Sequence, residues 1–284
     1  MSSCSIIIPI YRPLSPAEFD LVRHNLRMLR GFPAVLIGGH GQFALLSELR
    51  DALGAADDAE ITVETFEDRC FRDVSGYNSL LSEPDFYERF VSSDYILICQ
   101  HDAIILKPTL REWLGKGYAF VGSPMFEGYG EPRRPLQFLQ TLNGGLSLRH
   151  IPSTLSVFRN AVFLPRSLGI RVAGKVGIIS AVNWALSLIG TQRVVVRRKV
   201  LNEDVLWTRD IAAAFPMYRI PSPEIAASFA FEVCPADLFA RTGRQLPFGC
   251  HAFERYDPDF WLAHAPSEVV RLVRALTPAN ADKD

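Results

Sequence analysis

Two hydrophobic patterns alternate along the first hundred residues. Short runs rich in Ile, Val and Leu, typical of strands buried on both faces, occupy residues 5–10, 34–38, 61–66 and 95–99. Between them, apolar residues recur every three or four positions at residues 15–30, 43–53 and 76–90, which indicates helices. This alternation predicts an α/β fold with a mostly parallel sheet and helices on both faces.

The second half of the chain has a less regular pattern and shorter predicted elements. Helices are predicted at residues 108–114, 203–215 and 258–275. Extended segments are predicted at residues 104–106, 118–122, 141–149 and 225–233, and loops at 127–134 and 247–253. From the length, we expect one large domain over residues 1–255, followed by a C-terminal helix and tail at residues 256–284.

The composition is that of an ordinary globular protein. The 284 residues are 48% hydrophobic with a formal net charge of -1, so bulk charge indicates no nucleic-acid partner. The five cysteines form no CxxC pair, which argues against structural zinc and favours a reducing compartment. The start lacks a basic leader, and no run of roughly 18 apolar residues occurs, so we expect a cytoplasmic protein without a spanning helix.

Charge is unevenly distributed along the chain. No acidic residue lies between Glu131 and Glu203, whereas eleven of the 30 Lys and Arg residues do. Segments rich in basic residues and free of acidic ones favour binding to phosphate groups or to anionic lipid surfaces. Residues 176–190 are apolar with basic flanks, so one hypothesis is a peripheral element at the inner face of a membrane. The alternative is a core helix within a basic, apolar insertion at about residues 160–200.

Three polar side chains follow the strand predicted at residues 95–99. They are Gln100, His101 and Asp102. Open α/β sheets place binding sites at the carboxyl ends of strands, where such groups can bind a divalent cation and, through it, a diphosphate. The alternative is a plain turn in which Asp102 accepts hydrogen bonds from backbone N–H groups.

Three later motifs also carry residues suited to chemistry. The Asn143-Gly144-Gly145 segment permits positive φ angles and close approach of backbone to a ligand, although a tight turn would use the same residues. Glu203 and Asp204 open a predicted helix, where one acid suits the N-terminus and a second could be a general base. His251, in an aromatic loop, is either a packed residue or a metal or phosphate ligand.

The order of these motifs resembles a bacterial family of GT-A-type glycosyltransferases catalogued as DUF5672. It is also similar to the motif order of the β-1,4-galactosyltransferase type. The segments that carry the resemblance are YILICQHDA, NGGLSLR, NEDVLW and PFGCH, within residues 5–255. The resemblance implies a GT-A-like, Rossmann-like mixed sheet, with a nucleotide-binding half at residues 1–107 and a donor-sugar and acceptor half at residues 108–255.

The same resemblance assigns roles to individual residues. It implies Asp102 and His251 as ligands of Mn²⁺ or Mg²⁺, although His101 stands where such motifs usually carry a second Asp, so the sequence lacks a DxD. It implies Asp204 as the catalytic base, with Glu203 beside it. The residues implied to bind the nucleotide or donor sugar are Pro9, Ile10, Tyr11, Arg72, Asn78, Gln100, His101, Asp102, Asn143, Gly144 and Gly145, with Tyr77 nearby.

The resemblance implies sugar transfer, with inversion, from a nucleotide-diphosphate sugar to a glycan or lipid-linked acceptor hydroxyl. A UDP-sugar is the favoured donor, and cell-surface glycan or polysaccharide synthesis is the expected setting. Two other classes stay open. A sugar nucleotidyltransferase would carry a Gly-rich phosphate loop with a Lys or Arg near the first strand. In this chain, residues 9–15 offer only Arg12. A non-catalytic nucleotide- or glycan-binding module would need no base at Asp204.

Overall fold

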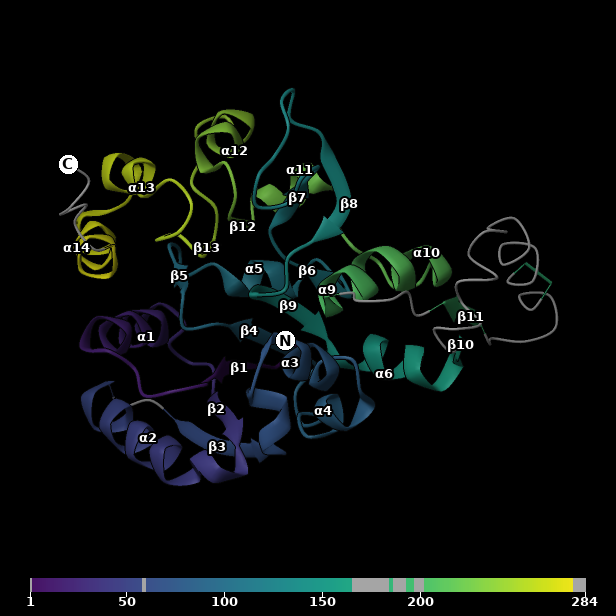
Figure 1. Cartoon of the computed structure of the whole chain (residues 1–284), viewed down its shortest axis with the longest axis horizontal. Helices are drawn as coiled ribbons and strands as arrows, with labels where there is room; N and C mark the ends of the chain where they lie inside the picture. Colours follow the sequence, from purple (N-terminus) through teal and green to yellow (C-terminus); the bar gives the residue numbers. More distant parts are fainter. Residues whose placement is uncertain (1, 58–59, 165–183, 186–192, 197–201, 278–284) are drawn as a thin grey trace.

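A six-stranded sheet forms the centre of the molecule (Figure 1). The computed structural model describes residues 2–57, 60–164, 184–185, 193–196 and 202–277. Strands β3, β2, β1 and β4 are parallel, whereas β9 is antiparallel to β4 and β6. In sheet order the strands are β3 (Ile61–Phe66), β2 (Ala34–Gly39), β1 (Cys4–Pro9), β4 (Tyr95–Cys99), β9 (Leu146–His150) and β6 (Phe120–Val121). The predicted α/β class with a mostly parallel sheet is confirmed.

Both faces of this sheet are buried because successive strand side chains point in opposite directions. In β1, Ile6 and Ile8 belong to one core and Ile7 to another. The first core is covered by α1 (Pro16–Met28), α2 (Phe43–Asp57) and α5 (Leu110–Leu114). The second is covered by α3 (Val74–Leu80), α4 (Pro84–Glu88) and α6 (Ile151–Asn160). The continuous apolar runs of the strands therefore reflect burial on two sides.

A smaller sheet and the C-terminal helices enclose a third core. The strand order is β12-β13-β5, with β13 parallel to β12 and antiparallel to β5. These strands are β12 (Ala230–Phe231), β13 (Gly249–His251) and β5 (Ala103–Ile105). The helices at this end are α12 (Pro235–Arg241), α13 (Pro258–His264) and α14 (Ser267–Leu276). Because β5 follows β4 closely, the turn at residues 100–102 lies where the two sheets meet.

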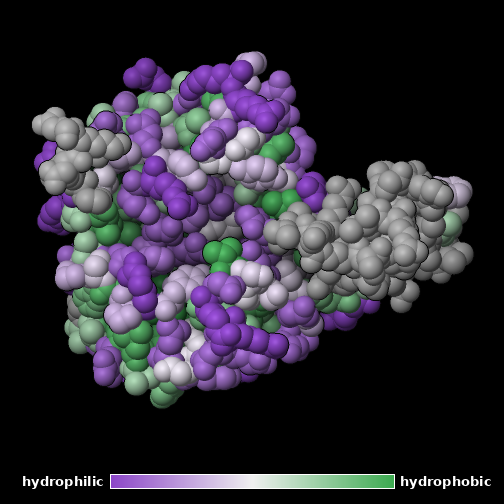
Figure 2. Space-filling view, in the orientation of Figure 1, coloured by the Kyte–Doolittle hydropathy of each residue, from purple (hydrophilic) through white to green (hydrophobic). Residues whose placement is uncertain are grey.

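The other described elements lie around the two sheets. They are the hairpin of β7 (Pro124–Phe126) and β8 (Phe138–Leu142), the parallel pair of β10 (Ala161–Leu164) and β11 (Arg193–Val196), the helix α11 (Pro223–Ala227), and the 3-10 turns His40–Gln42 and Asp68–Phe71. The helix predicted at residues 203–215 is present as α9 (Glu203–Val205), a π-helical turn at Leu206–Ile211 and α10 (Ala212–Ala214). The surface in Figure 2 mixes hydrophilic and hydrophobic side chains. No helix in the described part of the chain is long and apolar enough to cross a membrane.

Proline residues divide two of the predicted helices. The segment at residues 76–90 is two helices, α3 and α4, because Pro84 begins the second. The segment at residues 258–275 is likewise divided into α13 and α14 by Pro266. A proline lacks the N–H group that a helix interior requires, so it fits only in the first turn or just before it.

Three further predictions differ from the structure. The segment at residues 225–233 is mostly not extended, since α11 reaches Ala227 and only β12 is a strand. The predicted loop at residues 247–253 contains β13. The β7–β8 hairpin was not predicted, because its short strands lack an apolar run. Most of the predicted insertion at about residues 160–200, including residues 176–183 and 186–190, lies outside the described residues.

A side chain of α1 satisfies the free edge of β5. Asn25 is 2% exposed; its Nδ2 donates to the Ala103 carbonyl at 2.7 Å, and its Oδ1 accepts from the Ile105 N–H at 2.8 Å. This amide replaces the neighbouring strand that an edge strand otherwise lacks. It therefore fixes the strand that follows the turn at residues 100–102.

We expect Asn25→Ala to lower the free energy of unfolding by about 2–4 kcal/mol, because two buried backbone groups lose their partners. Urea unfolding followed by circular dichroism measures this change. Glu48→Gln, at an exposed position of α2, is the control and should change the value by less than about 0.5 kcal/mol. Equal stability of the two variants would contradict the role given to Asn25.

Candidate functional site

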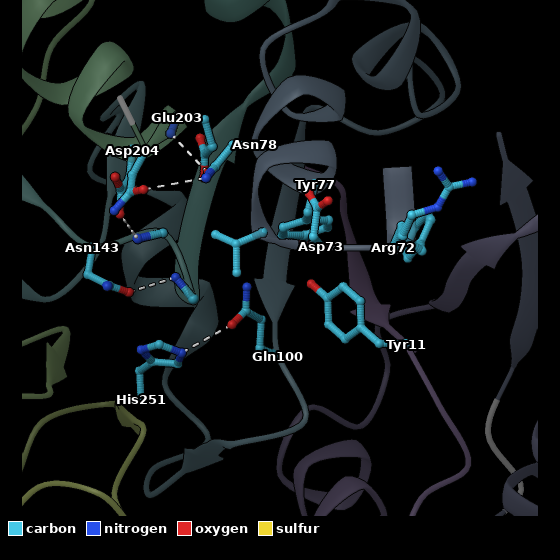
Figure 3. Close-up of a pocket in the computed structure, with 15 residues that line it drawn as sticks. Tyr11, Arg72, Asp73, Tyr77, Asn78, Gln100, Asn143, Glu203, Asp204 and His251 are labelled. Carbon is cyan, nitrogen blue, oxygen red and sulfur yellow. Dashed lines mark hydrogen bonds between the residues drawn. The ribbon is translucent and has the colours of Figure 1, made fainter. Parts of the chain in front are cut away.

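A cavity of about 410 Å³ lies at the carboxyl end of the main sheet. Strand β1 has β2 on one side and β4 on the other, so the strand order reverses here, as it does at ligand sites of other open α/β sheets. Most of the site residues predicted from the sequence line it together (Figure 3). These are Tyr11, Arg72, Tyr77, Asn78, Gln100, Asn143, Gly144, Gly145, Glu203, Asp204 and His251.

The glycine pair between β8 and β9 lets two walls of the cavity approach each other. A Cβ on Gly145 would lie 2.1 Å from His251 Nε2, and a Cβ on Gly144 would lie 2.6 Å from Glu203 Oε1. Both distances are too short for any side chain. The turn is held by Asn143, whose Oδ1 accepts from the Gly145 N–H at 2.7 Å. The pair is needed here for close contact between segments.

A buried ion pair anchors the helix that begins at Glu203. The fully buried Arg149 guanidinium donates to both Glu203 carboxylate oxygens, at 2.7 and 2.8 Å. It also donates to the Tyr87 hydroxyl at 3.1 Å. Burial alone would lower the pKa of Arg149, but Glu203 and Tyr87 reverse the effect, and the net direction is upward. Both oxygens of Glu203 are therefore used in anchoring.

The neighbouring acid has a different environment. Asp204 is 6% exposed; its Oδ2 accepts from the Gly144 N–H at 3.1 Å and its Oδ1 from the Val205 N–H at 2.7 Å. Burial, followed by the charge of Glu203, raises the pKa of Asp204 to about 7. Its two hydrogen bonds and Arg149 act in the opposite direction but are weaker. A carboxyl group that titrates near neutrality can accept a proton at working pH.

On the other side of the glycine pair, His251 contacts two carboxylates and an amide. Its Nδ1 lies 3.1 Å from Glu232 Oε1, and its Nε2 lies 3.2 Å from Gln100 Oε1 and 3.3 Å from Asp102 Oδ1. Burial would lower the pKa of His251, but Asp102 and Glu232 raise it well above its usual value. Burial would raise the pKa of Asp102, but His251 lowers it to about 2.

The corner formed by Gln100, Asp102 and His251 could hold a divalent cation. Asp102 Oδ1 is buried without a hydrogen-bond partner of normal geometry among the described residues, and it faces Nε2 of His251. Metal-binding histidines commonly donate their other N–H to a carboxylate, as His251 does to Glu232. No group of three or more His, Cys, Asp or Glu side chains arranged for a metal occurs in the described ranges. Further ligands would have to come from Gln100, water and the substrate.

A second, smaller cavity of about 200 Å³ adjoins the first and shares Tyr11, Phe71 and Arg72 with it. The other predicted residues found there are Pro9, Ile10 and His101. His101 Nε2 lies 3.7 Å from Glu18 Oε1. His101 thus belongs to this second cavity, whereas Asp102 pairs with His251. The predicted residues occupy two adjoining cavities and the buried corner beside them.

Glu232 and Asn202 are site residues that the sequence reasoning missed. Asn202 lines the larger cavity, and its Oδ1 lies 3.4 Å from Asn78 Nδ2. Glu232 contacts His251 from a segment that the pattern predicts as a plain strand. A lone acid within an otherwise apolar run, Phe229–Val233, was the available signal for Glu232.

The buried ion pair gives a direct test of this anchoring. We expect Arg149→Leu to lower the free energy of unfolding by about 3–5 kcal/mol, because it leaves the Glu203 charge buried without a partner. The double variant Arg149→Leu/Glu203→Leu should regain much of that loss. Urea unfolding measures each value.

The control for the ion-pair test is Arg134→Leu, which breaks the exposed Arg134–Asp237 pair and should cost less than about 1 kcal/mol. A loss for Arg149→Leu as small as that of this control would show that the buried pair does not anchor the helix.

Several solved structures are similar to this chain at low identity. The galactosyltransferase LgtC, in complex with donor and acceptor sugar analogues, is 14% identical with a TM-score of 0.49, over 96% of each chain. TarS residues 1–349 from S. aureus, in complex with UDP, is 14% identical with a TM-score of 0.32, over 52% of this chain and 47% of that one. The mannosyltransferase Ktr4p from S. cerevisiae, in complex with GDP, is 8% identical with a TM-score of 0.31, over 44% and 41%.

These likenesses assign no activity, and this chain spans less than half the length of the TarS and Ktr4p chains that it matches. A search of the curated proteins found no match. A family model described as "Protein of unknown function (DUF5672)" matches residues 60–251. That match covers more than half of the sequence and includes Gln100, the glycine pair, Asp204 and His251. The chain therefore belongs to the DUF5672 family.

Proposed function

We propose that this protein is a glycosyltransferase that moves a sugar from a nucleotide-diphosphate sugar to an acceptor hydroxyl, with inversion. One observation carries the proposal. A single cavity has a carboxyl group with a pKa near 7, Asp204, on one side of a glycine pair and the polar side chains of Gln100 and His251 on the other. Group transfer requires a base for the nucleophile, which Asp204 would supply, and positive charge for the leaving group, which a cation bound at this corner would supply.

Asp204 serves the acceptor side of this reaction. Its ionised carboxylate takes the proton of the acceptor hydroxyl as the acceptor oxygen forms a bond to the anomeric carbon. The bond from that carbon to the diphosphate oxygen breaks, and its electron pair stays on the diphosphate. Glu203 is less suited to this role because Arg149 occupies both of its oxygens.

The Gln100, Asp102 and His251 corner serves the leaving group. His251 would donate a hydrogen bond from Nε2 to the departing diphosphate, while the flanking Asp102 and Glu232 carboxylates leave the corner without net positive charge. A cation bound there, Mn²⁺ or Mg²⁺, would add Lewis-acid charge on the diphosphate oxygens. A metal bound to His251 Nε2 would displace its proton, so metal affinity should increase with pH. The backbone of Gly144 and Gly145 would face the sugar between the two sides.

The neighbouring cavity is suited to the base and ribose of the donor. Tyr11 and Phe71 give it aromatic surface, and Arg72 adds positive charge near the shared wall. Aromatic rings stack on nucleobases regardless of sequence, so they do not select the base. A UDP-sugar donor, a glycan or lipid-linked acceptor and a role in cell-surface polysaccharide synthesis, at the inner membrane face, belong to this proposal.

A thermal-shift screen tests the proposal. We expect UDP, GDP or one of their sugar conjugates to raise the melting temperature, and to raise it more with MnCl₂, because a ligand that binds only the folded state stabilises it. Sugar transfer to water or to an added acceptor is then measured as the amount of nucleoside diphosphate released. Stabilisation without any turnover would favour the non-catalytic binding module, and no stabilisation by any nucleotide would contradict the proposal.

The raised pKa of Asp204 predicts the pH dependence of the rate. The base must be ionised, so kcat should fall about tenfold per pH unit below pH 7 and level off above it. The charged groups that face Asp204 are Glu203 on its own helix and Arg149 on β9. Initial rates between pH 5 and 9, at saturating donor, measure this profile.

Asp204→Asn should reduce kcat by at least about 100-fold and remove this pH dependence, while the donor affinity stays within a few-fold. Asp210→Asn, further along the same helical segment and paired with Arg209, is the matched control. A rate for Asp204→Asn close to that of the control would rule out Asp204 as the base. Loss of donor binding instead of kcat would assign it a binding role.

A further inference from the structure

Glu232 lies next to His251 because of the register of two strands. Strand β12 pairs in parallel with β13, with Ala230 opposite Gly249 and Phe231 opposite Cys250. The residue directly after β12 is Glu232, and the next residue along β13 is His251. The pairing of backbones thus brings a carboxylate to an imidazole across a short edge of the smaller sheet.

One oxygen of Glu232 accepts two hydrogen bonds, from two side chains that line the cavity. Its Oε1 lies 3.1 Å from Nδ1 of His251 and 3.2 Å from Nδ2 of Asn143. A carboxylate accepts only, so both nitrogens donate their N–H groups to it. Glu232 therefore decides which ring nitrogen of His251 faces the cavity and which end of the Asn143 amide faces the glycine pair.

The contacts from Glu232 connect Asn143, Gly145 and His251 in a closed ring of contacts, called the circuit below. Asn143, with its Nδ2 held by Glu232, turns its Oδ1 to the Gly145 N–H at 2.7 Å. Gly145 in turn lies directly against the ring of His251, where even a Cβ would be 2.1 Å from Nε2. The circuit returns to Glu232 through His251 Nδ1. Displacement of any member would disturb the others.

Stability alone does not explain a carboxylate at this position. Glu232 is 8% exposed, and His251 is its only ion-pair partner among the described residues. Removing a charge from water costs free energy unless a precise partner compensates for it. Metal-binding histidines commonly donate their second ring N–H to such a carboxylate, which sets the tautomer and the orientation of the ring.

We propose that Glu232 is a positioning residue of the donor site, which sets the orientation of both His251 and the Asn143–Gly145 turn. This inference rests on the proposed function and adds a residue to it. Glu232 itself does not line the cavity and needs no contact with the substrate. Glu232 would influence diphosphate binding by orienting His251, and sugar binding by orienting the glycine pair.

Selective ¹⁵N labelling of the six histidines tests the orientation without any ligand. The Nδ1–H signal of His251, assigned with His251→Gln, should be downfield and protected from solvent exchange in the wild type. It should remain in Glu232→Gln, whose amide oxygen can accept the same bonds, and disappear in Glu232→Ala. A signal that persists in Glu232→Ala would overturn the proposal.

Calorimetric titration with UDP, and with GDP, in the presence of MnCl₂ gives the second readout. We expect Glu232→Ala to weaken binding by about 10–100-fold and Glu232→Gln to recover most of that loss. Asn143→Ala should act non-additively with Glu232→Ala, so that the double variant binds about as weakly as the worse single variant. Unchanged affinity in Glu232→Ala, or additive losses in the double variant, would overturn the proposal.

The two readouts separate the inference from the proposed function. If the wild type bound neither nucleotide, the proposed function would fail, while the histidine signal would still decide whether Glu232 orients His251. If Glu232→Ala failed to fold, Glu232→Gln with Asn143→Ala would provide the test. A lost Nδ1–H signal in Glu232→Gln, together with wild-type affinity, would show that the orientation does not matter for binding.

Discussion

The site depends on one steric constraint, the close approach of three chain segments at Gly144 and Gly145. His251 presses against one glycine, and the start of helix α9 presses against the other. A side chain at either position would separate the base proposed on one side from the corner of Gln100, Asp102 and His251 on the other. The distance between these two functions is therefore set by backbone packing, and the surrounding hydrogen bonds maintain it.

Two adjacent acids illustrate how environment assigns different tasks to similar groups. Glu203 is held by two hydrogen bonds from a fully buried guanidinium, which makes it an anchor. Asp204 receives only backbone N–H groups, and the nearby Glu203 charge adds to the effect of burial on its pKa. An ion pair at one residue thus fixes the geometry of the next, whose carboxyl pKa is raised by burial and by the neighbouring charge. The sequence order Glu-Asp alone does not show this division.

The support behind the site comes from both cores of the sheet and from the smaller sheet. Helix α3 carries Tyr77 and Asn78 from one core, α1 fixes β5 through Asn25 from the other side, and β13 brings His251 from the third core. The α3 wall and the segment after Asp204 are attached to the same core, and the His251 wall is attached to the third core. Such attachment to packed cores holds the side chains that line the cavity in a fixed geometry.

The sequence by itself determined the α/β class, the four parallel strands and the order of the motifs. This was possible because strands covered on both faces are continuous apolar runs, and because polar side chains directly after such runs stand out. It also brought forward Asp204, the glycine pair and His251 as candidates, although it could not say that they share one cavity. Its errors concern short elements, such as α11, β13 and the β7–β8 hairpin, whose hydrogen bonds join residues far apart in the sequence.

Only the tertiary structure shows the partners of Arg149 and Glu232. In the sequence, Arg149 is one of many basic residues in a basic interval. In the structure, its guanidinium donates to the carboxylate of Glu203, which lies 54 residues later in the chain. Glu232 becomes a candidate only through the register between β12 and β13. The burial of a charge and the identity of its partner depend on how distant segments pack, and no local pattern of hydrophobic and polar residues records that packing.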